Sequence, residues 1–186
     1  MITTMKSGLR LTFLMATFTF QCVNGQEQQP MIGQTAPTFE LKTLEGKSYS
    51  LEQLKGKPVV IHFSATWCPF CNAEAPHLEE LYQTYKYKNV QVIMVDVKED
   101  KSLVQKIQDR FKFSFPVLLD EDGAAAAKYA PEGVQPALAR HEVPIASNLI
   151  IDREGRIKFY SLLNTANFDA SLTELRQKLD ELLNSH

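Results

Sequence analysis

The chain has 186 residues, of which 44% are hydrophobic and 23% charged, an ordinary composition for a globular domain with additional segments. Its formal net charge of −2 argues against binding to a nucleic-acid backbone, which requires a strong surplus of basic residues. No run of like charges suggests an acidic or basic interaction tail.

The first 25 residues differ from the rest of the chain. Lys6 and Arg10 precede the short apolar run LTFLMATFTF, and the small residues of VNG follow it. The run is too short for a membrane-spanning helix, and this order of segments is typical of a secretory signal peptide. We therefore expect a signal peptide in residues 1–25 and a folded domain in residues 31–186. The alternative, a hydrophobic first helix of the domain, is disfavoured by the GQEQQP that follows.

Cys22 raises the possibility of a lipid anchor, because bacterial lipoproteins are cut just before a cysteine that receives a lipid. Small residues usually stand directly before that cysteine, and Gln21 is not small. We therefore expect export without lipidation. The mature chain, from about Gln26, then keeps only Cys68 and Cys71, in an oxidising compartment.

The chain between residues 36 and 63 predicts a hairpin, one helical turn and a buried strand. APTFELKTLEGKSYSL reads as two extended pieces that turn at Glu45 and Gly46. In SLEQLKG, Ser50 suits a helix cap and Gly56 a helix stop. The continuous apolar run at 58–63 is typical of a strand buried on both faces.

The rest of the chain alternates helices and strands. Apolar residues at spacings of three and four from Pro69 predict a helix of about four turns, and Asp100 is expected to cap a second helix. This order predicts an α/β fold with a central mixed β-sheet flanked by helices. Further strands are expected in VQVIMVDV, FPVLLD, SNLIID and RIKFYSL, a hairpin turn at 152–155, and helices in GAAAAKYA and DASLTELRQKLDELL.

Cys68 and Cys71 form a Cys-x-x-Cys pair at the junction between a predicted strand and a predicted helix. The unpaired N–H groups and the dipole at the helix N-terminus favour the thiolate of Cys68. Cys71, one turn deeper, is expected to be the more sheltered thiol that resolves a mixed disulfide. Pro69 suits the first helical position, where its missing N–H costs nothing.

Three other interpretations of the pair carry less weight. A zinc site needs four ligands, but a second cysteine pair is absent and the histidines lack ligand spacing, so we expect no metal and no other cofactor. A purely structural disulfide would close so short a loop that it constrains the unfolded chain little. A buried, inert dithiol does not suit an oxidising compartment. The pattern therefore favours a redox-active dithiol.

The segment FSATWCPFCNAEAPHLEELYQTY resembles the active site of thioredoxin-fold thiol-disulfide oxidoreductases of the exported TlpA/ResA-like group, within the AhpC/TSA–Redoxin superfamily. The likeness rests on Trp67 before the first cysteine, Cys-Pro-x-Cys, and Ala-Glu-x-Pro leading into a helix. It extends from about Ile32 to Leu183 and includes a segment like the group's N-terminal β-hairpin extension. The resemblance implies an enzyme of the bacterial periplasm or cell envelope that acts on protein disulfides or dithiols, supplied by a membrane-bound electron donor.

The resemblance also implies further site residues. Glu74 matches a glutamate that in relatives is placed to tune the cysteines, with a surface helix residue as the alternative, and Trp67 belongs to the same motif. His62 stands where relatives often have Asn and thioredoxin a buried carboxylate; it could move protons for the resolving thiol, with a hydrogen-bonded core histidine as the alternative. In relatives a cis-proline faces the dithiol, six residues before the Asp that ends the strand. Pro144, after Val143, stands eight before that Asp, and Ala146 holds the expected place. We expect Val143 and Pro144 to form the substrate-binding loop, with loss of the proline as the alternative.

The loop APEGVQPALARHE, residues 130–142, is longer than in relatives and is expected to lie beside the active site, as a specificity loop or as a neutral insertion. Phe70, between the cysteines, cannot donate a hydrogen bond to a thiolate, which favours a reductant over an oxidant.

Two alternative functions remain open from the sequence. A peroxiredoxin-like peroxidase shares the fold, but its Pro-x-x-x-Thr-x-x-Cys frame is missing, because Thr66 is only two residues before Cys68. A non-enzymatic envelope binding module with a structural disulfide would leave Cys68 unreactive towards an alkylating reagent after reduction.

Overall fold

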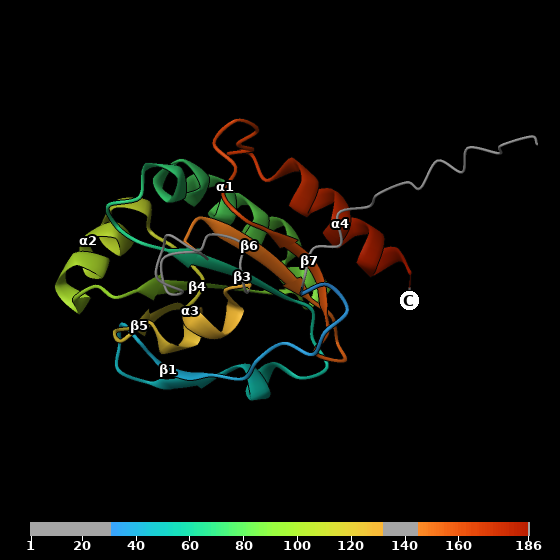
Figure 1. The fold of residues 1–186 in the computed structure, drawn as a ribbon, viewed down its shortest axis with the longest axis horizontal. Helices are drawn as coiled ribbons and strands as arrows, with labels where there is room; N and C mark the ends of the chain where they lie inside the picture. Colours follow the sequence, from blue (N-terminus) through green and yellow to red (C-terminus); the bar gives the residue numbers. More distant parts are fainter. Residues whose placement is uncertain (1–30, 132–144, 186) are drawn as a thin grey trace, which may run out of the picture.

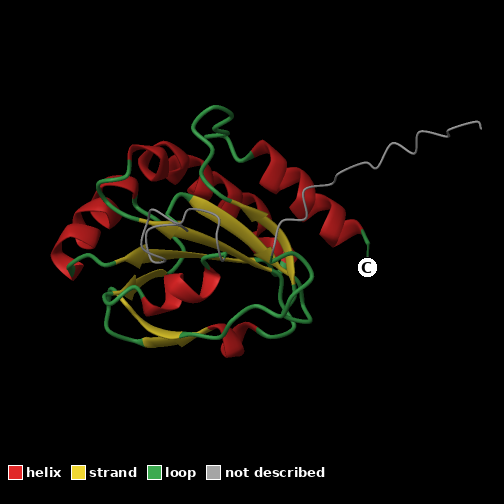
Figure 2. Ribbon diagram, in the orientation of Figure 1, coloured by secondary structure: helices red, strands yellow, loops and turns green. Residues whose placement is uncertain are grey.

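The computed structural model describes residues 31–131 and 145–185, so the expected signal peptide, Cys22, Val143 and Pro144 lie outside the described residues. Within these residues, a seven-stranded mixed sheet carries helices on both faces (Figures 1 and 2). In chain order the elements are β1 (Glu40–Thr43), β2 (Ser48–Ser50), the 3₁₀ helix η1 (Leu51–Leu54), β3 (Val59–Ser64), α1 (Pro69–Tyr85), η2 (Lys86–Lys88), β4 (Gln91–Val97), α2 (Lys101–Phe111), β5 (Val117–Asp120), α3 (Ala124–Tyr129), β6 (Ser147–Ile151), β7 (Ile157–Ser161) and α4 (Thr173–Asn184).

The strand order is β2-β1-β5-β4-β3-β6-β7. The central strands β3, β4 and β5 run parallel, whereas β6 pairs antiparallel with β3, and β1 antiparallel with β5. Every residue of β3 is buried, as its continuous apolar sequence predicts. The expected thioredoxin-like fold and its N-terminal hairpin, β1 and β2, are confirmed.

The sheet separates two hydrophobic clusters. One lies under α1, α2 and α4 and includes Leu78, Val104 and Leu179, one residue from each helix. The other lies on the opposite face, under α3 and the N-terminal segment, and includes Tyr129. Figure 1 shows α1 and α4 together above the sheet and α3 below it. Cys68 and Cys71 belong to the second cluster and follow the C-terminal end of the central strand β3.

The helix boundaries agree with most of the sequence signals. At η1 the expected capping box is present, with the Ser50 N–H donating to Gln53 Oε1. Asp100 stands at the N-cap of α2 as expected, and its backbone carbonyl accepts from Leu103 and Val104, but its side chain makes no capping hydrogen bond. In residues 31–131 and 145–185 no helix combines the length and apolar character needed to cross a membrane.

Candidate active site

Cys68 is the N-cap residue of α1. Its Sγ accepts a hydrogen bond from the backbone N–H of Cys71, with 3.3 Å between nitrogen and sulfur. Pro69 begins the helix, as the sequence indicates. Both thiols are free, and each cysteine exposes only 2% of its surface. The two cysteines are thus equally hidden from solvent, and the expected greater shelter of Cys71 does not appear as a smaller exposed surface.

The two thiols differ instead in their pKa values. A hydrogen bond from Cys71 lowers the pKa of Cys68 to about 6, assisted by the backbone N–H groups of Cys71 and Phe70 and opposed by burial. The same hydrogen bond raises the pKa of Cys71, and burial and the charge of the Cys68 thiolate raise it further. At neutral pH Cys68 is thus the thiolate and Cys71 its donor, an arrangement suited to thiol-disulfide exchange.

We predict that alkylation of the reduced protein by iodoacetamide separates the two cysteines. Cys68 should react with a midpoint near pH 6, because only its thiolate is nucleophilic and its pKa is about 6. Cys71 should stay unmodified over the same range, because its pKa is raised. Peptide mapping by mass spectrometry measures both rates. Parallel modification of both cysteines near pH 9 would contradict the assignment of Cys68 as the thiolate.

A buried polar network lies behind the dithiol, on the α1 face of the sheet. His62 on β3 stands directly opposite Asn148 on β6, and its Nδ1 lies 2.9 Å from Asn148 Oδ1. Asn148 Nδ2 donates to Glu74 Oε1 of α1 at 2.9 Å. Glu74 Oε2 lies 3.5 Å from the same nitrogen of His62. The structure therefore brings His62 and Glu74 together and joins them through Asn148.

Burial keeps this network uncharged at neutral pH. Burial lowers the pKa of His62 to about 4, against the opposite effect of its hydrogen bond with Asn148. Burial raises the pKa of Glu74 to about 8, partly offset by Asn148, and the charge of the Cys68 thiolate raises it further. The contact between His62 and Glu74 is thus one between neutral groups. The electrostatic link from Cys68 to Glu74 connects the network to the dithiol.

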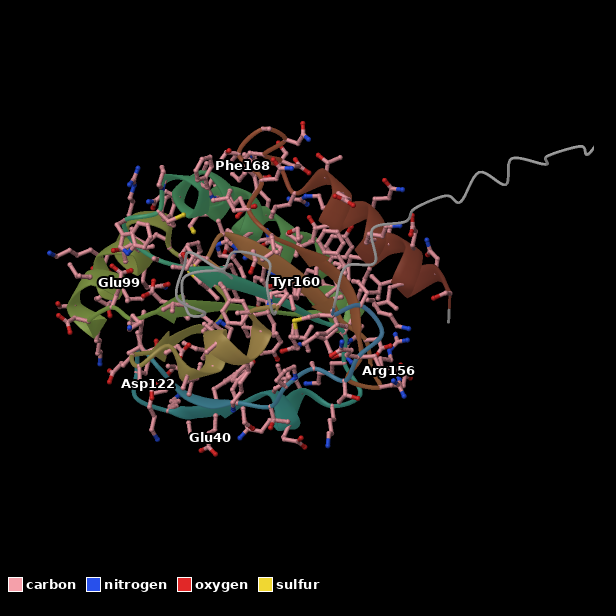
Figure 3. The ribbon with its side chains drawn as sticks, viewed as in Figure 1. Glu40, Glu99, Asp122, Arg156, Tyr160 and Phe168 are labelled. Carbon is pink, nitrogen blue, oxygen red and sulfur yellow. The ribbon has the colours of Figure 1, made fainter. Side chains whose placement is uncertain are left out.

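The residues beside the cysteines face in different directions. Trp67 exposes 67% of its surface, so its indole is available to a partner rather than packed on the sulfurs. Phe70 packs edge-to-face against Phe168, with ring centroids 4.9 Å apart. Phe168 belongs to the segment between β7 and α4, which lies near α1 (Figure 3). This segment therefore packs against Phe70 of the Pro69–Phe70 dipeptide between the cysteines.

Ala146 stands at the position where the family resemblance leads us to expect a proline. Its backbone has a positive φ of 57°, and its N–H donates to the carbonyl of Phe63 on β3 at 2.9 Å. A proline could not donate this hydrogen bond. Ala146 is buried in the same cluster as both cysteines. Val143 and Pro144 lie outside the described residues, as does most of the expected specificity loop, so their role stays a prediction.

A cavity of about 260 Å³ adjoins the buried network. Glu74 and Asn148 line it from α1 and β6, and Phe168, Asp169 and Leu172 line it from the segment before α4. Among the described residues, no three histidine, cysteine or acidic side chains lie together in a way that could hold a metal ion. Open space thus lies beside the Glu74 carboxyl.

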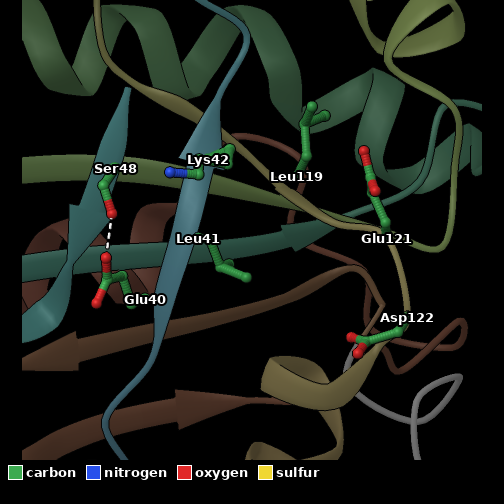
Figure 4. A pocket seen from close by; sticks show the side chains of 7 residues that line it. All are labelled: Glu40, Leu41, Lys42, Ser48, Leu119, Glu121 and Asp122. Carbon is green, nitrogen blue, oxygen red and sulfur yellow. Dashed lines mark hydrogen bonds between the residues drawn. The ribbon is translucent and has the colours of Figure 1, made fainter. Parts of the chain in front are cut away.

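A larger groove, of about 530 Å³, lies on the hairpin side of the sheet (Figure 4). Charged and polar side chains line it together with Leu41 and Leu119, and Ser48 donates a hydrogen bond to Glu40 there. The groove lies along β1 and the end of β5, and β4 separates β5 from β3. Neither cysteine lines it, so the redox site lies elsewhere.

Sequence reasoning missed several residues around the dithiol. Asn148 and Asp96 are buried polar residues within strands that are mostly apolar, a signal that could have marked both. Glu99 lies in a loop, and nothing in the local sequence indicates that its carboxylate reaches Thr66. Phe168 likewise meets Phe70 only through the tertiary fold.

Comparisons with known proteins agree with this geometry. Residues 32–160 match the model of the AhpC/TSA family. The chain is 33% identical over 138 residues to the thiol-disulfide oxidoreductase ResA of Bacillus cereus, which covers 74% of this chain and 73% of that protein. It is 35% identical over 127 residues to the ResA of Geobacillus thermodenitrificans, covering 68% of this chain and 67% of that protein.

Solved structures show the same relationship. A putative protein disulfide isomerase from Bacteroides thetaiotaomicron superimposes with a TM-score of 0.69 at 28% identity, over 82% of this chain and 90% of that one. A secreted Mycobacterium tuberculosis disulfide oxidoreductase homologous to Escherichia coli DsbE superimposes with a TM-score of 0.62 at 26% identity, over 77% of this chain and 96% of that one. Two thiols with divergent pKa values thus occur in a chain whose relatives exchange disulfides. The chain belongs to the AhpC/TSA family and is a thiol-disulfide oxidoreductase.

Proposed function

We propose that this chain is an exported enzyme that reduces disulfides of protein partners through Cys68 and Cys71. The observation that carries the proposal is the Sγ of Cys68 at the N-cap of α1, within hydrogen-bonding distance of the Cys71 N–H. This position stabilises a thiolate in a thiol that would otherwise be protonated at neutral pH.

The exchange takes place in two steps. The Cys68 thiolate attacks one sulfur of the partner disulfide, forms a mixed disulfide and releases the partner's other sulfur as a thiolate. Cys71 then loses its proton, attacks Cys68 Sγ and releases the partner's second thiolate. The partner gains two electrons, and the enzyme ends with a Cys68–Cys71 disulfide. A donor dithiol must then reduce that disulfide.

Glu74 and His62 are proposed to serve the second step. Cys71 has a raised pKa and needs a base, and Glu74, with a pKa of about 8, ionises close to neutral pH. His62 is held neutral and fixes Asn148, which in turn holds Glu74. The exposed Trp67 is proposed to contact the partner, together with Val143 and Pro144.

The direction of electron flow follows from the stability of the thiolate. A Cys68 pKa of about 6 lies nearer the value of about 7 in thioredoxin than the value of about 3.5 in DsbA. Phe70 packs on Phe168 and donates no side-chain hydrogen bond to Cys68. A less stabilised thiolate makes the disulfide less oxidising, which supports a reductant.

Export is proposed from the N-terminal sequence. The proposed signal peptide, residues 1–25, would deliver the domain of residues 31–186 to the periplasm or cell envelope, without lipidation of Cys22. The similarity to a secreted oxidoreductase supports this location. Because such a compartment is oxidising, a reductant there needs a supply of electrons, and a membrane-bound donor is proposed.

The reduction potential of the Cys68–Cys71 couple tests the proposal. We expect a reversible two-electron couple between about −270 and −200 mV after equilibration of residues 26–186 in graded dithiothreitol or glutathione buffers. A potential near −120 mV, the approximate value for DsbA, would instead identify an oxidant. Failure to form a reversible couple would contradict the two-step exchange.

A further inference from the structure

The turn between β3 and α1 is held at Thr66 from two sides. Glu99, in the loop between β4 and α2, accepts hydrogen bonds from both the N–H and the hydroxyl of Thr66, the latter at 2.5 Å. On the other side, Asn72 Nδ2 donates to the carbonyl oxygens of Thr66 and Cys68, at 3.0 and 2.9 Å. All three polar groups of Thr66 are thus engaged, two of them by one carboxylate.

Asp96 is buried near the end of β4, three residues before Glu99 in the sequence. Its burial, the charge of Glu99 and a side-chain hydrogen bond with Glu99 raise the pKa of Asp96 to about 8, so Asp96 is protonated at neutral pH. Since Glu99 already accepts twice from Thr66, the proton between the two carboxyl groups is that of Asp96. A neutral carboxyl that donates to a carboxylate forms a strong, charge-assisted hydrogen bond.

We propose that Glu99 is a positioning residue that fixes the Thr66 turn and thereby presents Cys68 and Trp67 to the partner disulfide. This inference rests on the proposed function and adds one residue to it. The turn closes with the Cys68 N–H donating to the Ala65 carbonyl at 3.0 Å, so a displaced Thr66 would displace the helix cap as well.

Two consequences of a released turn are measurable. In-line attack on a disulfide needs the sulfur in one geometry, so Cys68 would react more slowly. The distance of 3.3 Å between Cys71 N and Cys68 Sγ also depends on the cap, so a loosened cap weakens stabilisation of the thiolate and raises the pKa of Cys68. A merely structural role for Glu99 would lower the melting temperature without changing that pKa.

The test compares alkylation of Cys68 in the reduced wild type with that in Glu99→Gln and Glu99→Ala, from pH 5 to pH 9.5. If Thr66 is released, only a fraction of molecules keeps the competent turn, and we expect a rate about 10-fold lower at pH 7 in Glu99→Ala. The rate in Glu99→Gln should lie between those of the wild type and Glu99→Ala, because its amide keeps one acceptor oxygen. The midpoint of the pH profile should rise in both variants.

Three further variants guard against misfolding as the explanation. Thr66→Val removes the hydroxyl donor alone and should lower the rate, and Thr66→Ser should restore it. Glu121→Gln removes an exposed carboxylate in the groove of Figure 4 and should match the wild type. If Glu99→Ala reacts at the wild-type rate with an unchanged midpoint, the inference is wrong.

The proposed function fails separately, through absence of a reversible couple in the wild type, whereas these rates need no couple.

Discussion

A Cys68→Ser variant should reduce a disulfide-bonded test protein such as insulin at least about 1,000-fold more slowly than the wild type, because the attacking thiolate is gone. The loss should appear in the rate of insulin reduction with dithiothreitol as donor. The fold should be retained, since serine keeps an acceptor for the Cys71 N–H at the helix N-cap.

Cys71→Ser should fail at a different step. Its hydroxyl can still donate to the Cys68 sulfur, the interaction that most lowers the pKa of Cys68, so the first attack should proceed. Without a resolving thiol the mixed disulfide should accumulate, visible as a covalent adduct on a non-reducing gel. Cys71→Ala is the matched control. Cys71→Ala lacks both the resolving thiol and the donor to the Cys68 sulfur, so Cys68 in this variant should need a higher pH to react. Equal pH profiles for these two variants would contradict the role of the hydrogen bond.

The redox centre could be predicted from the sequence because its determinants are local. The apolar strand, Cys68, Pro69 and the periodic helix lie within one continuous segment, so the N-cap position of the thiolate follows from their order. The hairpin and the order of helices and strands were predictable for the same reason. Glycine at position 46 marks the hairpin turn, where the backbone adopts a positive φ of 80°.

The environment of the dithiol could not be predicted in the same way, because it is assembled from distant segments. His62 meets Asn148 through the register of β3 with β6, and Glu74 reaches both from the helix. The contact between Glu99 and Thr66 spans 33 residues. A sequence pattern shows that each of these residues is polar, but only the fold shows which of them share a proton or a charge.

The burial of Glu74 has a consequence for stability that depends on pH. Its pKa is raised from 4.5 to about 8 in the folded protein, so the folded state holds a proton that the unfolded state releases between these values. The stability from this group is therefore fully present below about pH 4.5 and is lost as pH rises through about 8. A difference of this size corresponds to at most about 5 kcal/mol of unfolding free energy.

Glu74→Gln should remove this dependence, because the amide stays neutral and can still accept from Asn148. Relative to the wild type, the variant should gain unfolding free energy from pH 5 to pH 9, by up to about 5 kcal/mol, in urea titrations of the reduced protein. Comparing variant with wild type at each pH cancels the contribution of Cys68, whose lowered pKa acts in the opposite direction. Glu121→Gln, with its exposed carboxylate, should show no such gain.

Glu74→Gln also tests whether the carboxyl that makes the stability depend on pH takes part in catalysis. If the ionised Glu74 is the base for Cys71, Glu74→Gln should leave the first attack by Cys68 intact and slow the release of the mixed disulfide. A gain in stability at high pH with unchanged resolution would show that Glu74 is a buried acid without a catalytic role. A slower resolution together with the gain would show that the carboxyl which destabilises the fold at high pH is retained because the second exchange step uses it.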